Sequence, residues 1–179
     1  MKSKLELALL GIILQSVDFI LDFDVFQLNI TSAIAFVLII IGLLPYKTEQ
    51  NRLFSKCLKS SIRIAVIFAV SVVMTVFNFA TYNSSVSMLF FAIISVLYMY
   101  MTYYFTECIV LQAKMVAKQD ISKTMKSTWT LLGVGIVGYY FVASMNLGII
   151  VLIVHVAYIL AALYYAMTVR NLWNQITEV

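Results

Sequence analysis

Six long apolar stretches make up most of this chain and limit what it can fold into. They cover residues 5–21, 26–45, 62–82, 87–107, 128–144 and 147–169 of the 179. A transmembrane helix needs about 20 apolar residues, because it rises ~1.5 Å per residue across ~30 Å of hydrocarbon. Strands of a membrane β-barrel are about half as long and alternate in polarity. The sequence therefore predicts an all-α, polytopic membrane protein, a six-helix bundle forming a single domain over residues 1–179.

The charged residues indicate how such a bundle would sit in a membrane. Only 11% of the residues are charged, against roughly 25% in soluble domains. All of the basic residues flank the stretches on what would be one side: Lys2, Lys4, Lys47, Arg52, Lys56, Lys59, Arg63, Lys114, Lys118, Lys123, Lys126 and Arg170. By the positive-inside rule, this pattern predicts a cell-membrane protein with both termini in the cytoplasm. Lysines that alternate with apolar spans suit anionic lipid headgroups, so we expect no nucleic-acid partner.

An acidic turn separates the first two stretches. Asp18, Asp22 and Asp24 are three of the eight acidic residues in the chain. An aspartate deep in a bilayer costs roughly 2.5 to 3.5 kcal/mol on insertion scales. We therefore expect these carboxylates to lie in water or to line a polar cavity on the outer side, and Asp18 to face the bundle interior, water or an interfacial partner.

The residues around this turn carry a resemblance to a known group of proteins. The acidic pair Asp22 and Asp24, the apolar run 35–43 and the juxtamembrane segment 51–57 are similar to those of small uncharacterised integral membrane proteins of Gram-positive bacteria. Thr31 and Ser32 stand where that group has Pro-Asp. The resemblance implies a bacterial plasma membrane location and no particular activity.

One set of polar residues could form a ligand site. His155, the sole histidine, lies about eight residues into the last stretch, hence ~12 Å deep. Asp18 lies at a comparable depth, and an Asp–His contact there could hold a proton, orient a solute or coordinate a cation. The full candidate ligand set is Asp18, Asp22, Asp24, Asn29, Asn78 and His155. Alternatively, His155 donates one hydrogen bond to a backbone carbonyl or a tyrosine and only stabilises packing. Asn78 could likewise only join two helices.

Small residues predict one close helix pair. Gly133, Gly135 and Gly138 lie in the fifth stretch, and Ala157 and Ala161 supply a matching small face on the sixth. Small side chains allow close helix approach in lipid. The tyrosines around Tyr98 to Tyr104 are typical of an interfacial aromatic belt.

The cytoplasmic link 50–61 is open to three interpretations. Leu53, Phe54, Cys57 and Leu58 form one apolar face there. That face suits an amphipathic helix at the headgroups or the first turns of a long third span, and a helix that docks a partner is a third interpretation. We expect residues 109–117 to extend the fourth span into the cytosol.

Catalytic chemistry has little support in the sequence. Cys57 and Cys108 both lie near the cytoplasmic face, about half a membrane thickness from His155. The His-Glu-x-x-His spacing of zinc hydrolases does not occur. We therefore expect no enzyme activity, no metal site and no cofactor.

Two functions remain open. The chain could be a membrane-embedded interaction or accessory subunit, which contacts a protein partner through its basic loops or forms a homo-oligomer. It could instead be a small-solute transporter or substrate-capture subunit with an outward-facing polar site.

Overall fold

The computed structural model describes residues 2–17, 20–23, 26–46, 52–77, 85–115, 119–145 and 147–177. Six α-helices, one 3₁₀ turn and a two-stranded ribbon are formed over these residues. Their bounds are α1 Lys2–Gln15, β1 Ile20–Phe23, β2 Phe26–Asn29, α2 Ile30–Leu43, η1 Leu44–Tyr46, α3 Arg52–Val76, α4 Ser85–Met115, α5 Gln119–Ser144 and α6 Ile149–Thr177.

The four later helices agree with the membrane prediction. Among the described residues, α3, α4, α5 and α6 are long and apolar enough to cross a membrane. They contain 25, 31, 26 and 29 residues. At ~1.5 Å per residue they are about 37 to 46 Å long, more than the ~30 Å of hydrocarbon. The all-α prediction is confirmed for this part of the chain.

The first two stretches differ from the expected continuous helices. Helix α1 ends at Gln15 rather than continuing to residue 21, and α2 begins at Ile30 rather than at residue 26. Between them β1 and β2 pair antiparallel, with Ile20 opposite Asn29 and Phe23 opposite Phe26. Each helix has 14 residues, or ~21 Å, which is less than a full span. The reason is local, because aspartates favour turns over helix interiors and Asn29 caps the start of α2.

Three further helix boundaries bear on expectations from the sequence. Pro45 lies in the 3₁₀ turn that follows α2, in agreement with its inability to continue a helix with normal bonding. Helix α3 then runs without a break from Arg52, so residues 52–61 of the link form the first turns of a long helix rather than a separate amphipathic one, and residues 50 and 51 lie outside the described residues. Helix α4 continues past Glu107 to Met115, which confirms the expected extension.

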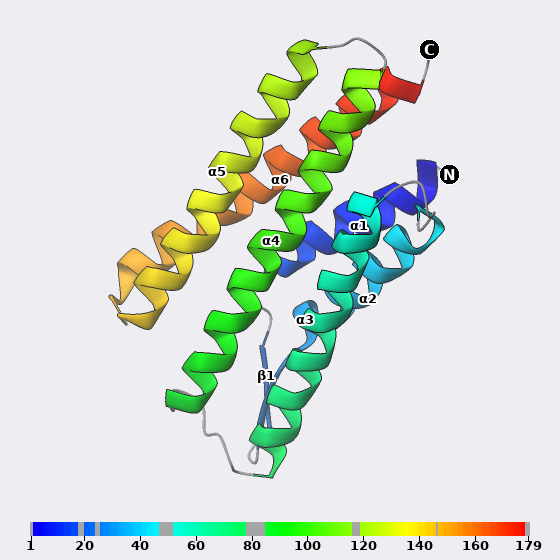
Figure 1. Cartoon of the computed structure of the whole chain (residues 1–179). Coiled ribbons are helices and arrows are strands. Elements are labelled where there is room, and N and C mark those ends of the chain that lie inside the picture. The colour runs from blue at the N-terminus through cyan, green and yellow to red at the C-terminus, as the bar shows by residue number, and fades with distance from the viewer. Residues whose placement is uncertain are drawn as a thin grey trace.

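The helices form a closed ring in sequence order. Each of the six packs on the next, and α6 packs on α1. The ends of α4 and α6 and the starts of α1 and α5 lie toward one end of the bundle, whereas the ribbon, the end of α3 and the start of α4 lie at the other (Figure 1). We call these the basic end, after the described basic residues at the helix ends found there, and the ribbon end.

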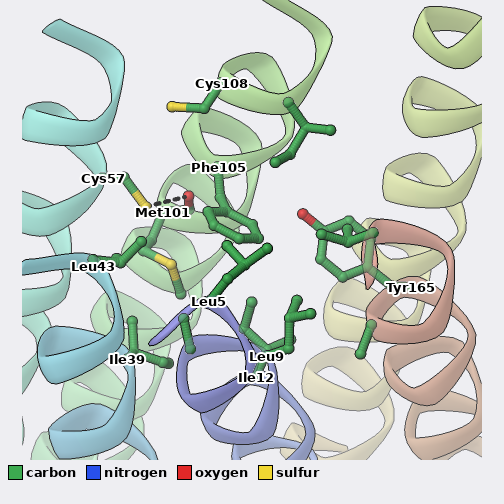
Figure 2. Packing of buried hydrophobic residues seen from close by; sticks show 14 of the residues in the cluster. Leu5, Leu9, Ile12, Ile39, Leu43, Cys57, Met101, Phe105, Cys108 and Tyr165 are labelled. Atoms are coloured by element: carbon green, nitrogen blue, oxygen red, sulfur yellow. Dashed lines mark hydrogen bonds between the residues drawn. The ribbon is translucent and has the colours of Figure 1, made fainter. Parts of the chain in front are cut away.

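Buried residues concentrate toward the basic end. The last buried residue of α3 is Ile64, and the first of α4 is Ile94. On α6, burial begins at Tyr158. In the centre of the ring, Leu5, Leu9 and Ile12 of α1 face Met101 and Phe105 of α4 and Tyr165 of α6 (Figure 2). The exposed apolar side chains lie on the outer faces of the helices, as expected for surfaces against lipid.

The tightest helix contact among the glycines joins α1 to α2. A Cβ added to Gly42 would lie 2.5 Å from the Ala8 nitrogen and 2.6 Å from the Lys4 carbonyl oxygen. A Cβ on Gly11 would lie 2.6 Å from the Ala35 carbonyl oxygen. Only glycine permits backbones this close, so two short helices gain a contact that compensates for their length.

Candidate functional site

The predicted ligand set is only partly described. Asp18, Asp24 and Asn78 lie outside the described residues, so a contact between Asp18 and His155 stays a prediction. Asp22 lies in β1 opposite Gln27, at the ribbon end. Asn29 and His155 belong to the described residues, and both lie beside the ends of the two short helices.

His155 binds the carboxyl end of α1. Its Nε2 lies 2.8 Å from the backbone oxygen of Ser16. A carbonyl can only accept, so Nε2 carries the hydrogen and donates. The last four carbonyls of a helix lack partners within the helix, and leaving them unpaired in hydrocarbon costs several kcal/mol. His155 therefore supplies a hydrogen-bond donor to the backbone where α1 ends.

Neighbouring side chains complete the same cap. The Ser16 hydroxyl donates to the Ile13 carbonyl at 2.7 Å. The Thr31 hydroxyl, at the start of α2, hydrogen-bonds to the Val17 carbonyl. Thr31 also lies 2.8 Å from Asn29 Oδ1. The end of α1 is thus tied to the beginning of α2 as well as to α6.

Asn29 acts on α2 in the complementary way. Its Oδ1 accepts from the backbone nitrogen of Ser32 at 2.9 Å. This is an N-cap, which satisfies one of the free N–H groups at a helix start and contributes about 1 kcal/mol. Within the described structure, Asn29 and His155 of the predicted ligand set are thus both bound to helix ends.

Aromatic rings hold the histidine in place. The rings of His155 and Tyr139 stack with centroids 4.6 Å apart, and Tyr139 stacks in turn on Tyr158 at 5.7 Å. Tyr139 belongs to α5, so the column joins α5 to α6. No sequence pattern predicts this stack, because residues 16 apart on different helices have no fixed spacing.

Gln15, the last residue of α1, is the exception in this polar region. Among the described residues, its Oε1 is the buried side-chain polar atom without a hydrogen-bond partner. A buried acceptor without a donor is destabilising by about 1 to 3 kcal/mol. Gln15 lies next in sequence to Ser16, and so beside the His155 contact.

A second group of hydroxyls joins the helices inside the ring. The Thr106 hydroxyl of α4 donates to the Thr102 carbonyl at 2.9 Å, and it shares a 2.8 Å hydrogen bond with the Tyr165 hydroxyl of α6. The Tyr165 hydroxyl also lies 3.4 Å from the Thr102 carbonyl oxygen. The Trp129 indole of α5 donates to Thr102 Oγ1 at 3.3 Å. The Tyr98 hydroxyl of α4 donates to the Ile12 carbonyl of α1 at 3.1 Å. These bonds connect four of the six helices.

Tyr98 corrects the expectation of a uniform aromatic belt. Tyr100 and Tyr103 are exposed, as belt residues would be, but Tyr98 is buried in the core. A helix turns 100° per residue, so tyrosines two positions apart point to opposite sides. The tyrosine-rich sequence could not show which side faces the ring.

The residues predicted to pack α5 on α6 have different surroundings. A Cβ on Gly135 would lie 3.2 Å from the Tyr158 ring, and one on Gly138 would lie 3.7 Å from Val154. At Gly133 the nearest atom is 4.0 Å away and belongs to Trp129 of the same helix. Ala161 is buried, whereas Ala157 is exposed. Gly135 and Gly138 are thus the two glycines that face α6.

The thiols and acidic groups are the other side chains that could carry chemistry. Cys57 and Cys108 are both buried, and Cys57 Sγ lies 3.4 Å from the Met101 carbonyl oxygen (Figure 2). Over the described residues, no three histidine, cysteine, aspartate or glutamate side chains lie together as metal ligands would.

Among the described residues, two ion pairs join neighbouring helices at the basic end. Arg170 of α6 pairs with Glu6 of α1 at 3.1 Å. Lys126 of α5 lies 3.9 Å from Glu107 of α4. Both pairs are partly exposed, so each contributes at most about 1 kcal/mol.

Comparison with known protein families, curated proteins and solved structures finds no match to this chain.

Proposed function

We propose that the protein is a non-enzymatic subunit embedded in the cell membrane, which acts by contacting a partner protein. In this proposal all six helical segments lie in the membrane and both termini are cytoplasmic. The positions of the twelve basic residues support that orientation.

One observation carries the proposal: three polar side chains of the interior are bound to other helices. His155 binds the end of α1, Tyr165 binds Thr106, and Tyr98 binds the Ile12 carbonyl. Hydrogen bonds of this kind between helices stabilise membrane bundles by about 0.6 to 2 kcal/mol each. Polar side chains used in this way stabilise the helix bundle. A partner protein would then bind to the exposed surface of the bundle.

The extension of α4 is the best place for a partner to bind. At ~46 Å this helix is ~16 Å longer than the hydrocarbon is thick. Near its carboxyl end Leu111 and Met115 are exposed, the latter by 70%, and Lys114 is exposed beside them. An apolar pair with a neighbouring cation, held above the membrane surface, suits a helix-in-groove contact with an acidic partner.

Photo-crosslinking in intact membranes tests this function. A photoreactive residue at Met115 should yield one discrete crosslinked product with a second polypeptide. The same residue at Val134, which is exposed by 65% in the middle of α5 and should face lipid, should yield none. Equal products at both positions, or none at Met115, would count against a partner at the basic end.

The alternative of a solute-capture subunit is favoured by one feature, the buried and unpaired Oε1 of Gln15. A solute that donates a hydrogen bond there would relieve its cost. In that case a panel of small solutes should raise the thermal stability of the purified protein, and Gln15→Leu should abolish the increase. Stability that no solute changes would remove this alternative.

A further inference from the structure

An open apolar groove lies between α1 and α6 and begins at the basic end. Its volume is about 350 Å³, and it is lined by Glu6, Leu9, Leu10, Ile13, Ala166, Met167 and Arg170. The α1 residues follow the i, i+3, i+4, i+7 spacing of one helix face. Over those seven positions the groove extends ~10 Å toward the middle of the bundle.

The mouth of the groove carries charges of both signs. Arg170 Nε donates to Glu6 Oε1 at 3.1 Å, and Arg170 Nη2 lies 3.1 Å from the same oxygen. The Arg170 side chain is 63% exposed and that of Glu6 is 50% exposed. A guanidinium has five N–H groups and a carboxylate has two oxygens. Donors of Arg170 and the Oε2 of Glu6 therefore remain available to a ligand at the same point.

The mouth also lies at the depth of lipid headgroups. Arg170 follows the first residue of α6, Ile149, by 21 positions, or ~32 Å along the helix. The hydrocarbon core is ~30 Å thick. If α6 crosses the membrane, Arg170 and Glu6 lie beside lipid phosphates while Leu10, Ile13 and Met167 lie beside acyl chains.

We propose that this groove is a binding site for a phospholipid with an ethanolamine headgroup. The lipid phosphate binds the Arg170 guanidinium, and the primary ammonium binds Glu6 Oε2. The first part of one acyl chain lies over Leu10, Ile13 and Met167. The headgroup is a zwitterion, so its negative phosphate complements Arg170 and its positive ammonium complements Glu6. This charge complementarity favours an ethanolamine lipid over other lipids.

Other lipids fit the mouth less well. An anionic glycerol headgroup gains the contact with Arg170 but is repelled by Glu6. A choline headgroup has the right charges, but its quaternary nitrogen has no N–H group to donate to a carboxylate. A volume near 350 Å³ is at the small end of ligand sites, which suits one segment of an acyl chain rather than a whole lipid.

Native mass spectrometry of the full-length protein would test the site. The protein is stripped of lipid in detergent and then exposed to an equimolar mixture of phosphatidylethanolamine, phosphatidylglycerol and phosphatidylcholine. We expect the ethanolamine lipid to be retained in preference to each of the others by about fivefold, as for a contact of about 1 kcal/mol. Equal retention of the three lipids would overturn the proposal.

Charge variants identify the site. Glu6→Gln should shift the preference from the ethanolamine lipid to the anionic lipid, because the repulsion is lost and the ammonium contact with it. Arg170→Gln should lower retention of both. Lys126→Gln, which breaks the ion pair between α4 and α5, is the matched control and should change nothing. A preference that is the same in Glu6→Gln as in the wild type would contradict the headgroup assignment.

A steric variant does not depend on the charges. Met167→Trp, at a side chain exposed by 63%, should fill the groove and abolish the preference. Val134→Trp, at a side chain exposed by 65% on α5, should leave the preference intact. Both positions are exposed, so neither change disturbs the core. Unchanged retention in Met167→Trp would place the lipid elsewhere and overturn the proposal.

Discussion

At the scale of single residues, the polar side chains act mainly on helix ends. His155 donates to the Ser16 carbonyl, and Asn29 accepts from the Ser32 amide. Both residues could be found in the sequence, because polar groups in apolar stretches are few. Their partners could not be found, because the sequence does not show that α1 ends at Gln15. Sequence reasoning thus located the polar residues and left their role open between ligand contact and packing.

Replacement of His155 tests its role as a cap. His155→Phe keeps a flat ring for Tyr139 to stack on but leaves the Ser16 carbonyl without this donor. We expect the free energy of unfolding to fall by about 1 to 3 kcal/mol, measured by reversible unfolding in detergent. His155→Gln retains an N–H donor and should lose less. A Phe variant as stable as the wild type would show that the contact contributes nothing.

At the scale of elements, the four long helices were predictable and the two short ones were not. Apolar length alone identifies α3 to α6, because each exceeds the thickness of a membrane. Stretches 5–21 and 26–45 have similar lengths in the sequence but divide into 14-residue helices and a ribbon. The composition of a stretch does not show where its helix ends when side chains from other helices cap that end, as His155 does for α1. The close approach of α1 and α2 at Gly11 and Gly42 was also missed. The sequence predicts close packing where glycines are most frequent, which is in α5.

Two alanine substitutions compare the glycines directly. Gly42→Ala places a methyl group 2.5 Å from the Ala8 nitrogen, so α1 and α2 must separate. We expect a loss of about 1 to 3 kcal/mol from overpacking. Gly133→Ala meets no atom closer than 4.0 Å and should be neutral or slightly stabilising, because alanine favours helix. Equal effects in a thermal unfolding assay would contradict the α1–α2 contact.

A double-mutant cycle measures the bond between α4 and α6. Tyr165→Phe and Thr106→Val each remove one partner of the 2.8 Å contact. We expect a coupling energy of about 0.6 kcal/mol, the mean for hydrogen bonds between membrane helices, and at most about 1.7 kcal/mol. Tyr100→Phe, at an exposed tyrosine of α4, serves as the control and should not couple to Thr106→Val. A coupling near zero would mean that packing alone joins the two helices here.

At the scale of the whole molecule, the ring has one end rich in basic residues and one that holds the ribbon. The start of α1 and the end of α6 lie toward the basic end (Figure 1). The core is densest there, from Phe54 to Ile64 on α3 and from Ile94 to Ala113 on α4. The alternation of apolar stretches with basic links predicted this polarity. The closure of α6 on α1 depends on contacts between distant residues, such as Arg170 with Glu6, which no local pattern reveals.

Cysteine accessibility in intact cells tests the proposed membrane architecture most directly. In a Cys57→Ala, Cys108→Ala background, single cysteines replace Asp22 in the ribbon, Leu147 in the α5–α6 turn and Lys123 near the start of α5. We predict that a membrane-impermeant maleimide labels the first two in intact cells and Lys123→Cys only after the membrane is opened. Labelling of all three from the same side, or of Asp22→Cys only in opened cells, would contradict a six-segment bundle with a cytoplasmic basic end.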